Sequence, residues 1–312
     1  MAQMKEKLEA LKTQMMEYFV GKESVAQDML ICLLAGGHVL LEDVPGVGKT
    51  TLARTLAKSM ECDFGRIQFT PDTLPGDVLG NMIYQPNVGE FVYREGAVMH
   101  QIVLADEINR TSPKTQSSLL EAMAEGQVTV DGKTYALPEP FMVIATQNPV
   151  EFLGTYPLPE AQMDRFMMRL TLGYPENDEE LRLARNFLEG KTVAKIKGVC
   201  TTEEVVAWKK EVEKIRLSDG LIKYVRDMVE LTRLEKSFVL GASPRAMLTL
   251  IRASQAKAFL LGRDYVKPDD VKAVAVNVLH HRLCLTPEAK IRKEDVDRLL
   301  KELILKTKVP ME

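Results

Sequence analysis

The pattern of hydrophobic positions changes once along the chain, near residue 175. Before that point, short apolar runs predict β-strands, and stretches with helical spacing separate them. The chain opens with one helical stretch, in which Leu8, Leu11 and Met15 recur three or four residues apart and Tyr18 follows. The five predicted strands cover residues 39–42, 66–70, 102–106, 141–146 and 168–172. Helices predicted at 50–60 and 113–125 alternate with these strands, which favours a parallel sheet covered by helices on both faces.

After residue 175 the apolar residues keep only helical spacing. Four stripes predict helices that pack on one another, around residues 221–234, 247–261, 271–278 and 296–303. Cap signals agree with this reading, since Thr201 or Thr202 with Glu204 downstream is typical of a helix start. We therefore expect an α/β domain over residues 1–175 and an all-helical domain over residues 176–312.

Two segments, residues 77–96 and 126–138, do not fit the alternation of strands and helices and look inserted. The first has alternating apolar residues on both sides of a turn signal at 86–89. The second contains Asp131-Gly132, a dipeptide typical of a type I′ turn. Both segments predict β-hairpins. Periodicity alone leaves open whether they decorate the surface or take part in function.

The composition is that of a globular chain, because 312 residues with 46% hydrophobic content can bury one large core and a smaller one. The longest apolar runs are far shorter than the ~20 residues of a membrane helix, and the first turns are rich in Lys and Glu, unlike a signal peptide. We therefore expect a cytoplasmic protein without membrane insertion. The cysteines lack metal-ligand spacing, and buried reduced thiols are expected at Cys32, Cys62, Cys200 and Cys284.

Charge is unevenly distributed although the net charge is only −3. Residues 1–189 carry 16 Lys and Arg against 27 Asp and Glu, a net of −11, whereas residues 190–312 carry 25 against 17, a net of +8. This asymmetry favours head-to-tail packing of subunits. Binding of nucleic acid by the basic half ranks lower, because its Lys and Arg are interleaved with acids and no pattern of aromatic and basic residues accompanies them.

The strongest chemical signal follows the predicted strand 39–42. It is the run Asp43-Val44-Pro45-Gly46-Val47-Gly48-Lys49-Thr50-Thr51. Gly46 and Gly48 let the backbone curl so that N–H groups face phosphate oxygens, Lys49 reaches the β and γ phosphates, and the Thr50 hydroxyl can ligate Mg²⁺. A strand, this loop and a helix in succession predict binding of a nucleoside triphosphate. Asp43 stands where the motif GxxxxGK[ST] has its first glycine, but the loop's own glycines are intact.

A second signal lies about fifty residues further on, where the predicted strand 102–106 ends in Asp106 and is followed by Glu107. Acids at the end of a buried parallel strand emerge at the ligand-binding edge of the sheet. Asp106 is then expected to hold the Mg²⁺ shell, and Glu107 to polarise the attacking water. For this segment alone, ordinary solvated charges at a strand end remain an alternative. Beside a phosphate loop at this spacing, that alternative is a poor one.

Five motifs in order resemble those of the AAA+ ATPases, and within them the MoxR family. They are the phosphate loop, Ala105-Asp106-Glu107-Ile108-Asn109-Arg110, Ala145-Thr146-Gln147-Asn148-Pro149, Leu158-Pro159-Glu160-Ala161-Gln162-Met163-Asp164-Arg165-Phe166, and Gly241-Ala242-Ser243-Pro244-Arg245. The resemblance spans nearly the whole chain. It implies an α/β fold, with an AAA+ core built on a five-stranded parallel sheet between helices, two β-hairpin inserts and a C-terminal all-helical lid domain.

The resemblance also implies roles that the residues alone do not establish. Asn148 matches sensor 1, which orients the attacking water or the γ-phosphate; taken alone, it reads as a turn residue before a proline. Arg165 matches the arginine finger offered to the neighbouring subunit, and otherwise reads as a surface ion pair. Arg245 matches sensor 2, and otherwise reads as a charge at a helix end. Gly21 matches the place where relatives hold adenine, and Arg110 is a weaker candidate to reach across subunits.

The implied site residues form two overlapping sets. Those implied to act in catalysis are Lys49, Glu107, Asn148, Arg165 and Arg245. Those implied to contact the nucleotide are Gly21, Pro45, Gly46, Val47, Gly48, Lys49, Thr50, Thr51, Asp106 and Arg245, with Thr50 and Asp106 as metal ligands.

The function implied by the resemblance is Mg²⁺-dependent ATP hydrolysis in a ring, expected to be a hexamer, with ATP and Mg²⁺ as cofactors. It drives chaperone-like remodelling or activation of client proteins that carry a von Willebrand factor A domain, often while a metal or cofactor is installed. One alternative is a nucleic-acid motor, which the hairpins disfavour because they carry few basic residues. Another is a nucleotide-gated binding switch that turns over slowly. The intact Glu107, Asn148 and Arg165 argue for turnover.

Overall fold

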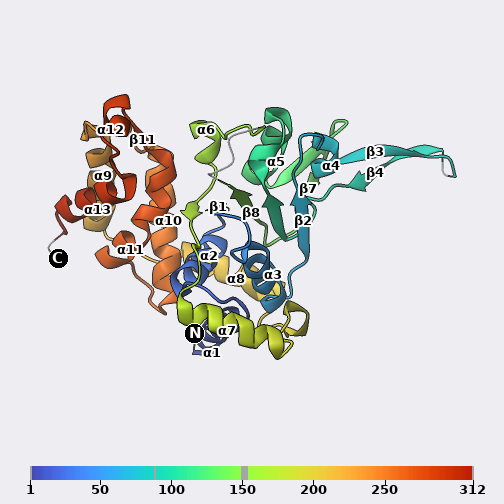
Figure 1. Ribbon diagram of the computed structural model, residues 1–312, viewed down its shortest axis with the longest axis horizontal. Helices are drawn as coiled ribbons and strands as arrows, with labels where there is room; N and C mark the ends of the chain where they lie inside the picture. Colours follow the sequence, from blue (N-terminus) through green and yellow to red (C-terminus); the bar gives the residue numbers. More distant parts are fainter. Residues whose placement is uncertain (1, 88, 149–153, 311–312) are drawn as a thin grey trace.

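A five-stranded parallel sheet forms the centre of the molecule, as predicted (Figure 1). The computed structural model describes residues 2–87, 89–148 and 154–310. The strands lie in the order β2-β5-β8-β1-β9. Their bounds are β1 Val39–Glu42, β2 Phe64–Gln68, β5 Ile102–Asp106, β8 Met142–Gln147 and β9 Met168–Leu170. Three of the five bounds differ from the predicted ones by one or two residues, while β1 and β5 begin and end as predicted.

Both faces of the sheet are buried, because alternate residues of each strand enter different apolar clusters. On β1, Val39 and Leu41 belong to one cluster and Leu40 to the other. On β5, Ile102 and Leu104 belong to the first cluster, and the residues that follow each of them belong to the second. Helices cover the two faces: α1 Ala2–Tyr18, α2 Glu23–Leu34, α3 Lys49–Ser59 and α5 Pro113–Glu125. This double cover is why the strands read as continuous apolar runs.

Helix α2 is an element that the hydrophobic pattern did not predict. Eight of its residues are buried, including every one from Met29 to Leu34. A helix enclosed on all sides loses the one-sided periodicity by which an amphipathic helix is recognised. The opening helix α1 was predicted, and its residues Leu8, Leu11 and Met15 are buried. Cys32, Cys62 and Cys200 are buried and unbridged, whereas Cys284 is only half-buried.

The two inserted segments form β-hairpins, as predicted. Strands β3 Gly80–Gln85 and β4 Glu90–Glu95 follow the short helix α4 Pro75–Leu79 and project away from the body as a long arm (Figure 1). The predicted turn at 86–89 includes Val88, which lies outside the described residues. Strands β6 Gln127–Val130 and β7 Lys133–Ala136 form the second hairpin. The rings of Tyr93 and Tyr135 stack 4.0 Å apart and join the two hairpins.

The C-terminal part is mostly helical, and its helices stand beside and below the sheet (Figure 1). They are α7 Asn177–Leu188, α8 Thr202–Glu213, α9 Asp219–Leu234, α10 Pro244–Leu260, α11 Pro268–Leu279, α12 Pro287–Ile291 and α13 Val296–Lys306, with the 3-10 turn η3 His280–Arg282 after α11. The short helix α6 Glu160–Met163 precedes β9, and two further 3-10 turns are η1 Ile108–Arg110 and η2 Val193–Lys195.

The expectation that only helices follow residue 175 needs one correction. Strands β10 Phe238–Leu240 and β11 Cys284–Leu285 pair antiparallel within this region. Strands of two or three residues are too short for an alternating pattern, so the sequence carries no signal for them. The predicted cap is confirmed, since Thr201 Oγ1 accepts a hydrogen bond from the Glu204 backbone N–H at 3.4 Å. Among the described residues, no helix combines the length and the apolar character that crossing a bilayer requires.

Candidate nucleotide site

The phosphate loop occupies residues 43–48, between the end of β1 and the start of α3. Gly46 and Gly48 have φ of +87° and +92°, in the left-handed region that favours glycine. Gly48 is the N-cap of α3, so Lys49 is the first residue of the helix. The unpaired N–H groups of this helix start and the positive end of its dipole face the loop, an arrangement suited to an anion.

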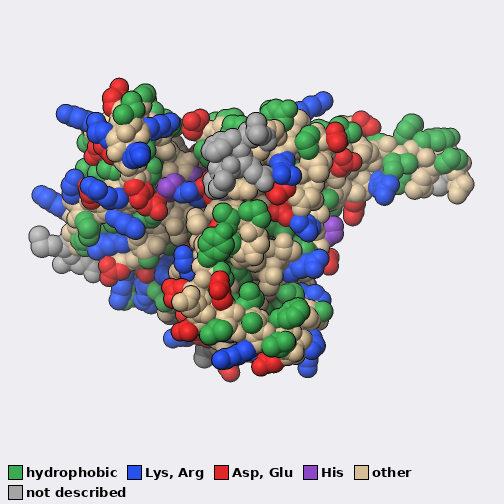
Figure 2. Space-filling view, in the orientation of Figure 1, with side chains coloured by type: hydrophobic (Ala, Val, Ile, Leu, Met, Phe, Trp, Pro, Cys, Tyr) green, Lys and Arg blue, Asp and Glu red, His purple; other side chains and the backbone are tan. Residues whose placement is uncertain are grey.

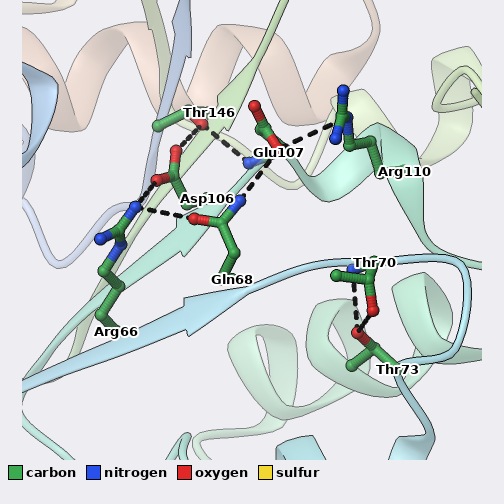
Figure 3. A network of polar contacts seen from close by, with 8 residues as sticks. All are labelled: Arg66, Gln68, Thr70, Thr73, Asp106, Glu107, Arg110 and Thr146. Carbon is green, nitrogen blue, oxygen red and sulfur yellow. Dashed lines mark hydrogen bonds and ion pairs between the residues drawn. The ribbon is translucent and has the colours of Figure 1, made fainter. Parts of the chain in front are cut away.

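The carboxylates of Asp106 and Glu107 lie at the same edge of the sheet, in a polar network (Figure 3). The Thr146 hydroxyl, on the neighbouring strand β8, donates to Asp106 Oδ1 at 2.6 Å and accepts from the Glu107 backbone N–H at 2.9 Å. On the other side, β2 brings in Arg66, whose Nη2 donates to Asp106 Oδ2 at 2.6 Å. Neighbouring parallel strands therefore fix the orientation of Asp106 from both sides.

Glu107 has φ 58° and ψ 49°, the left-handed conformation that non-glycine residues rarely adopt. Its Oε2 accepts a hydrogen bond from Gln68 Nε2 at 2.9 Å and lies 3.4 Å from Arg110 Nε (Figure 3). Strained backbone conformations of this kind persist where the surroundings hold them and are frequent at functional sites. The side chain of Glu107 is thus held at the edge of the sheet by partners from two different elements.

One cavity of about 410 Å³ joins the loop and the acids. Its lining residues are Pro45, Gly46, Gly48, Lys49, Thr50, Thr51, Arg66, Gln68, Asp106, Glu107 and Asn148. Of the residues implied to contact nucleotide, Gly21, Val47 and Arg245 do not line this cavity. Val47 is buried in the apolar core. Gly21 lies against the Phe19 ring, which a side chain at residue 21 would meet at 2.6 Å.

Lys49 is half-buried, and its Nζ donates a hydrogen bond to the backbone carbonyl of Asp43 at 2.7 Å. Burial lowers the pKa of Lys49, while the negative charges of Asp43, Asp106 and Glu107 act in the opposite direction. Burial is the larger cause, so the pKa of Lys49 is lowered overall, and its side chain lines the cavity beside the loop that would cradle phosphates.

Thr50 and Asp106 fit the role of Mg²⁺ ligands. Both line the cavity, and both offer the hard oxygen atoms that Mg²⁺ takes together with phosphate oxygens and water. A single carboxylate and a hydroxyl are also the typical protein contribution to a nucleotide-bound Mg²⁺.

Asp43, which departs from the general loop motif, has a structural role of its own. Its carboxylate is 6% exposed and accepts hydrogen bonds from the backbone N–H groups of Leu172 at 2.5 Å and Gly173 at 2.8 Å. Those residues follow β9 and lead toward α7. A glycine at residue 43 could not make these bonds. The aspartate therefore ties the start of the phosphate loop to the segment that connects the two parts of the chain.

Replacing Asp43 with glycine is expected to lower the free energy of unfolding by about 2–4 kcal/mol, because the carboxylate's three charge-assisted hydrogen bonds, from the backbone N–H groups of Val44, Leu172 and Gly173, are lost. Asp43→Asn should lose less, since an amide oxygen still accepts. Chemical denaturation measures both values. The exposed Asp72, replaced with Asn, is the control and should leave stability unchanged. A wild-type free energy of unfolding in Asp43→Gly would show that the carboxylate does not hold this segment.

The other implied residues lie in different places. Asn148 is buried at the end of β8 and lines the cavity, whereas Pro149 lies outside the described residues. Arg165 does not line the cavity; its Nη1 donates to the carbonyl of Leu120 on α5 at 2.6 Å. Arg245, at the start of α10, is also outside the cavity. Its positive charge is among the causes that lower the pKa of Arg282, after burial.

Sequence reasoning placed Thr146 at the ligand edge of the sheet but missed two polar residues of the site, Arg66 and Gln68. In the structure Gln68 ends β2 and pairs in register with Asp106, but the strand was predicted to run to residue 70, so Gln68 was not recognisable as a strand end. Polar residues at the carboxyl ends of neighbouring parallel strands meet at one edge. Arg66 carries no such signal, since a basic residue in an edge strand is ordinary.

Comparison with known proteins agrees with this geometry. Residues 38–168 match the model of the family described as "ATPase family associated with various cellular activities (AAA)", and residues 230–303 match the AAA lid domain. Chaperone MoxR1 of Mycobacterium tuberculosis is 43% identical over 279 residues, covering 86% of this chain and 74% of that protein. The chain belongs to the MoxR family of AAA+ ATPases. It is accordingly an enzyme that hydrolyses ATP.

Two further relatives of this MoxR-family ATPase extend over almost the whole chain. The YeaC protein of Bacillus subtilis is 51% identical over 293 residues, covering 94% of this chain and 92% of YeaC. A crystal structure of an ATPase candidate from Cytophaga hutchinsonii superimposes with a TM-score of 0.92 at 40% identity, covering 99% of this chain and 96% of that one. The fold of core and lid is therefore shared with that solved structure.

Proposed function

We propose that this ATPase works as a Mg²⁺-dependent ring of identical subunits that remodels or activates client proteins. The proposal depends on one observation: some of the implied catalytic residues line the cavity, and others lie outside it. Lys49, Glu107 and Asn148 share one cavity with the phosphate loop, whereas Arg165 lies outside it. Arg66 also lines the cavity, but its guanidinium is bound to Asp106, so we infer that Arg165 of a second subunit supplies the arginine that stabilises phosphoryl transfer. We keep residues 1–175 and 176–312 as the proposed core and lid.

Each residue of the cavity has a proposed task. Lys49 and the loop N–H groups hold the β and γ phosphates, while Thr50 and Asp106 hold Mg²⁺, which neutralises charge on the phosphate oxygens. Glu107 orients and polarises the attacking water, and Asn148 orients the water or the γ-phosphate.

A second cavity supports a place for the nucleoside. It measures about 600 Å³, and Thr51 lines both cavities, so the two are neighbours. Tyr18, Leu183 and Phe187 give it an apolar lining suited to a flat base. Gly21 follows Tyr18 by three residues, at the end of α1. We propose that adenine lies here, between α1, α3 and α7.

The projecting hairpin of β3 and β4 supports a client-binding role. Its exposed apolar residues include Tyr84 and Phe91, whose rings lie 5.3 Å apart, and Phe91 is 65% exposed. Figure 2 shows hydrophobic side chains gathered along this arm. The relative MoxR1 is named a chaperone. We propose that the arm contacts clients, that these carry a von Willebrand factor A domain, and that a metal or cofactor is installed in them.

A nucleic-acid motor remains the second candidate function. Its hairpins would need basic tips, and here the first hairpin carries Glu90, Arg94 and Glu95 while the second has Lys133 beside Asp131. Phosphate binding requires a clear excess of positive charge, which neither hairpin has. Stimulation of ATPase activity by single-stranded DNA at physiological salt would revive this candidate.

Two measurements test the proposed function: the molecular mass of the assembly and the change in ATP turnover when a client protein is added. We expect the wild-type chain to assemble into a ring, proposed to be a hexamer, on addition of Mg²⁺ and ATP, measured by light scattering after size exclusion. A purified von Willebrand factor A domain protein encoded beside this chain should raise its ATP turnover. Lys49→Ala, which cannot grip the phosphates, is the control and should show neither response. A monomer in every nucleotide state would contradict the ring.

A further inference from the structure

One of the contacts between lid and core is made by a buried arginine, Arg282, on the 3-10 turn after α11. Its side chain is 3% exposed. Its Nε donates to Asp164 Oδ1 at 2.6 Å, and its Nη2 donates to the carbonyls of Phe166 at 2.7 Å and Asp164 at 3.2 Å. Its Nη1 donates to the carbonyl of Met167 at 3.2 Å and to that of Val278. One guanidinium thus binds a carboxylate and three carbonyls of a single loop, residues 164–167.

Neighbouring groups strengthen this contact. His281 Nε2 is hydrogen-bonded to the carbonyl of Phe166 at 3.0 Å, so Phe166 is bound by two consecutive lid residues. The planar fork of arginine holds several acceptors in fixed directions, which the single ammonium of lysine cannot do. A buried guanidinium also needs all its acceptors, because an unpaired buried charge is strongly unfavourable. Loop 164–167 is therefore fixed to the lid more firmly than an ordinary surface contact would fix it.

The loop held in this way carries Arg165. Arg282 binds the residues on both sides of it, Asp164 and Phe166, while the guanidinium of Arg165 reaches α5 of the core and contacts Leu120. The lid thus constrains the backbone on both sides of Arg165, in addition to the core hydrogen bonds of the same loop. A displacement of the lid relative to the core would move Arg165 by way of Arg282.

We propose that Arg282 is the positioning residue for Arg165. It fixes loop 164–167 so that Arg165 reaches the nucleotide of the neighbouring subunit, and it couples the lid of one subunit to hydrolysis in the next. The inference rests on the proposed function of Arg165 as the residue that acts across the interface.

The first test is Arg282→Gln. A misplacement of about 1 Å costs roughly 10²-fold in rate, so we expect a fall in kcat of about that size at saturating ATP. The dissociation constant for ATP, measured by calorimetry, should stay at the wild-type value, because the subunit's own cavity is untouched. Arg282→Lys should recover little, since it keeps the charge but not the fork. Full turnover in Arg282→Gln would overturn the proposal.

A mixing experiment separates positioning from a general structural defect. Arg282→Gln keeps an intact Glu107, and a Glu107→Gln subunit keeps an intact Arg165 and Arg282. In rings mixed one to one, about half of the subunits keep Glu107 and can hydrolyse ATP. About half of these adjoin a Glu107→Gln subunit, whose Arg165 is correctly positioned, so turnover should rise to about a quarter of wild type. Arg165→Ala mixed with Glu107→Gln should recover equally. Lys49→Ala mixed with Glu107→Gln should not recover, because neither subunit can hydrolyse.

Recovery of turnover in the two mixtures distinguishes the role of Arg282 from the role of Arg165. Recovery in both the Arg282 and the Arg165 mixtures supports the proposal. Recovery with Arg165→Ala alone overturns the role of Arg282 while leaving Arg165 as the trans-acting residue. Recovery with neither overturns the role of Arg165 itself and the inference with it. If Arg282→Gln shows no cooperative thermal transition, Asp164→Asn takes its place in every mixture, because it removes only the carboxylate partner of the buried guanidinium.

Discussion

Arg165→Ala is expected to lower kcat for ATP by about 10³-fold or more, the range seen when an arginine that stabilises phosphoryl transfer is removed. Its guanidinium does not line the cavity of its own subunit, so the affinity of that subunit for ATP should not change. Steady-state turnover at saturating ATP measures the first quantity, and calorimetry with Mg²⁺ and ATP the second. A large loss of turnover at constant affinity is the signature of an interaction made in the transition state.

The control for Arg165 is a second arginine that makes only a local contact. Arg226 on α9 is exposed and pairs with the adjacent Asp227, so Arg226→Ala should keep wild-type turnover. Arg165→Lys tests the chemistry, because it keeps a positive charge without the planar fork and should recover only a small part of the loss. If the assembled Arg165→Ala protein hydrolyses ATP at the wild-type rate, this arginine has no part in catalysis. The proposal that the ring completes each site would then lose its main support.

The central sheet could be predicted because each of its strands is marked by a short, continuous pattern of residues in the sequence. Strands β1 and β5 begin and end as predicted, since each is an apolar run that ends in acids at the ligand edge. Helix α2 could not be predicted in the same way, because burial on all sides removes the periodicity. The pair β10 and β11 also left no signal, as strands of two and three residues are shorter than any recognisable pattern.

The same distinction applies to the candidate site, where residues within short motifs could be predicted and residues joined by long-range contacts could not. The phosphate loop, Asp106 and Glu107 lie within short motifs, so their spacing was enough to predict that they meet. The role of Asp43 could not be read from its motif, because its partners at Leu172 and Gly173 lie about 130 residues away in sequence. The same holds for Arg282, which is separated from Asp164 by 118 residues. Long-range polar contacts depend on the packing of whole domains, and no local pattern encodes them.

Glu107→Gln is expected to lower kcat by about 10²- to 10⁴-fold, because it removes the group that polarises the attacking water. Glutamine keeps the size of the side chain, and its carbonyl oxygen can still accept the hydrogen bond from Gln68. ATP binding should therefore persist, and the variant should accumulate bound ATP instead of ADP. Rapid filtration with radiolabelled ATP, followed by separation of the bound nucleotides, measures both quantities in one sample.

The position of Glu107 makes this substitution a sharp test. Its left-handed backbone is held by the Thr146 hydroxyl and its carboxylate by Gln68, so the variant side chain should stay in the same place. Glu121, an exposed residue of α5, is the matched control, and Glu121→Gln should bind and hydrolyse ATP normally. Undiminished steady-state turnover in purified Glu107→Gln would mean that another group activates the water. Slow wild-type turnover that a client protein does not accelerate would favour the nucleotide-gated switch over the motor.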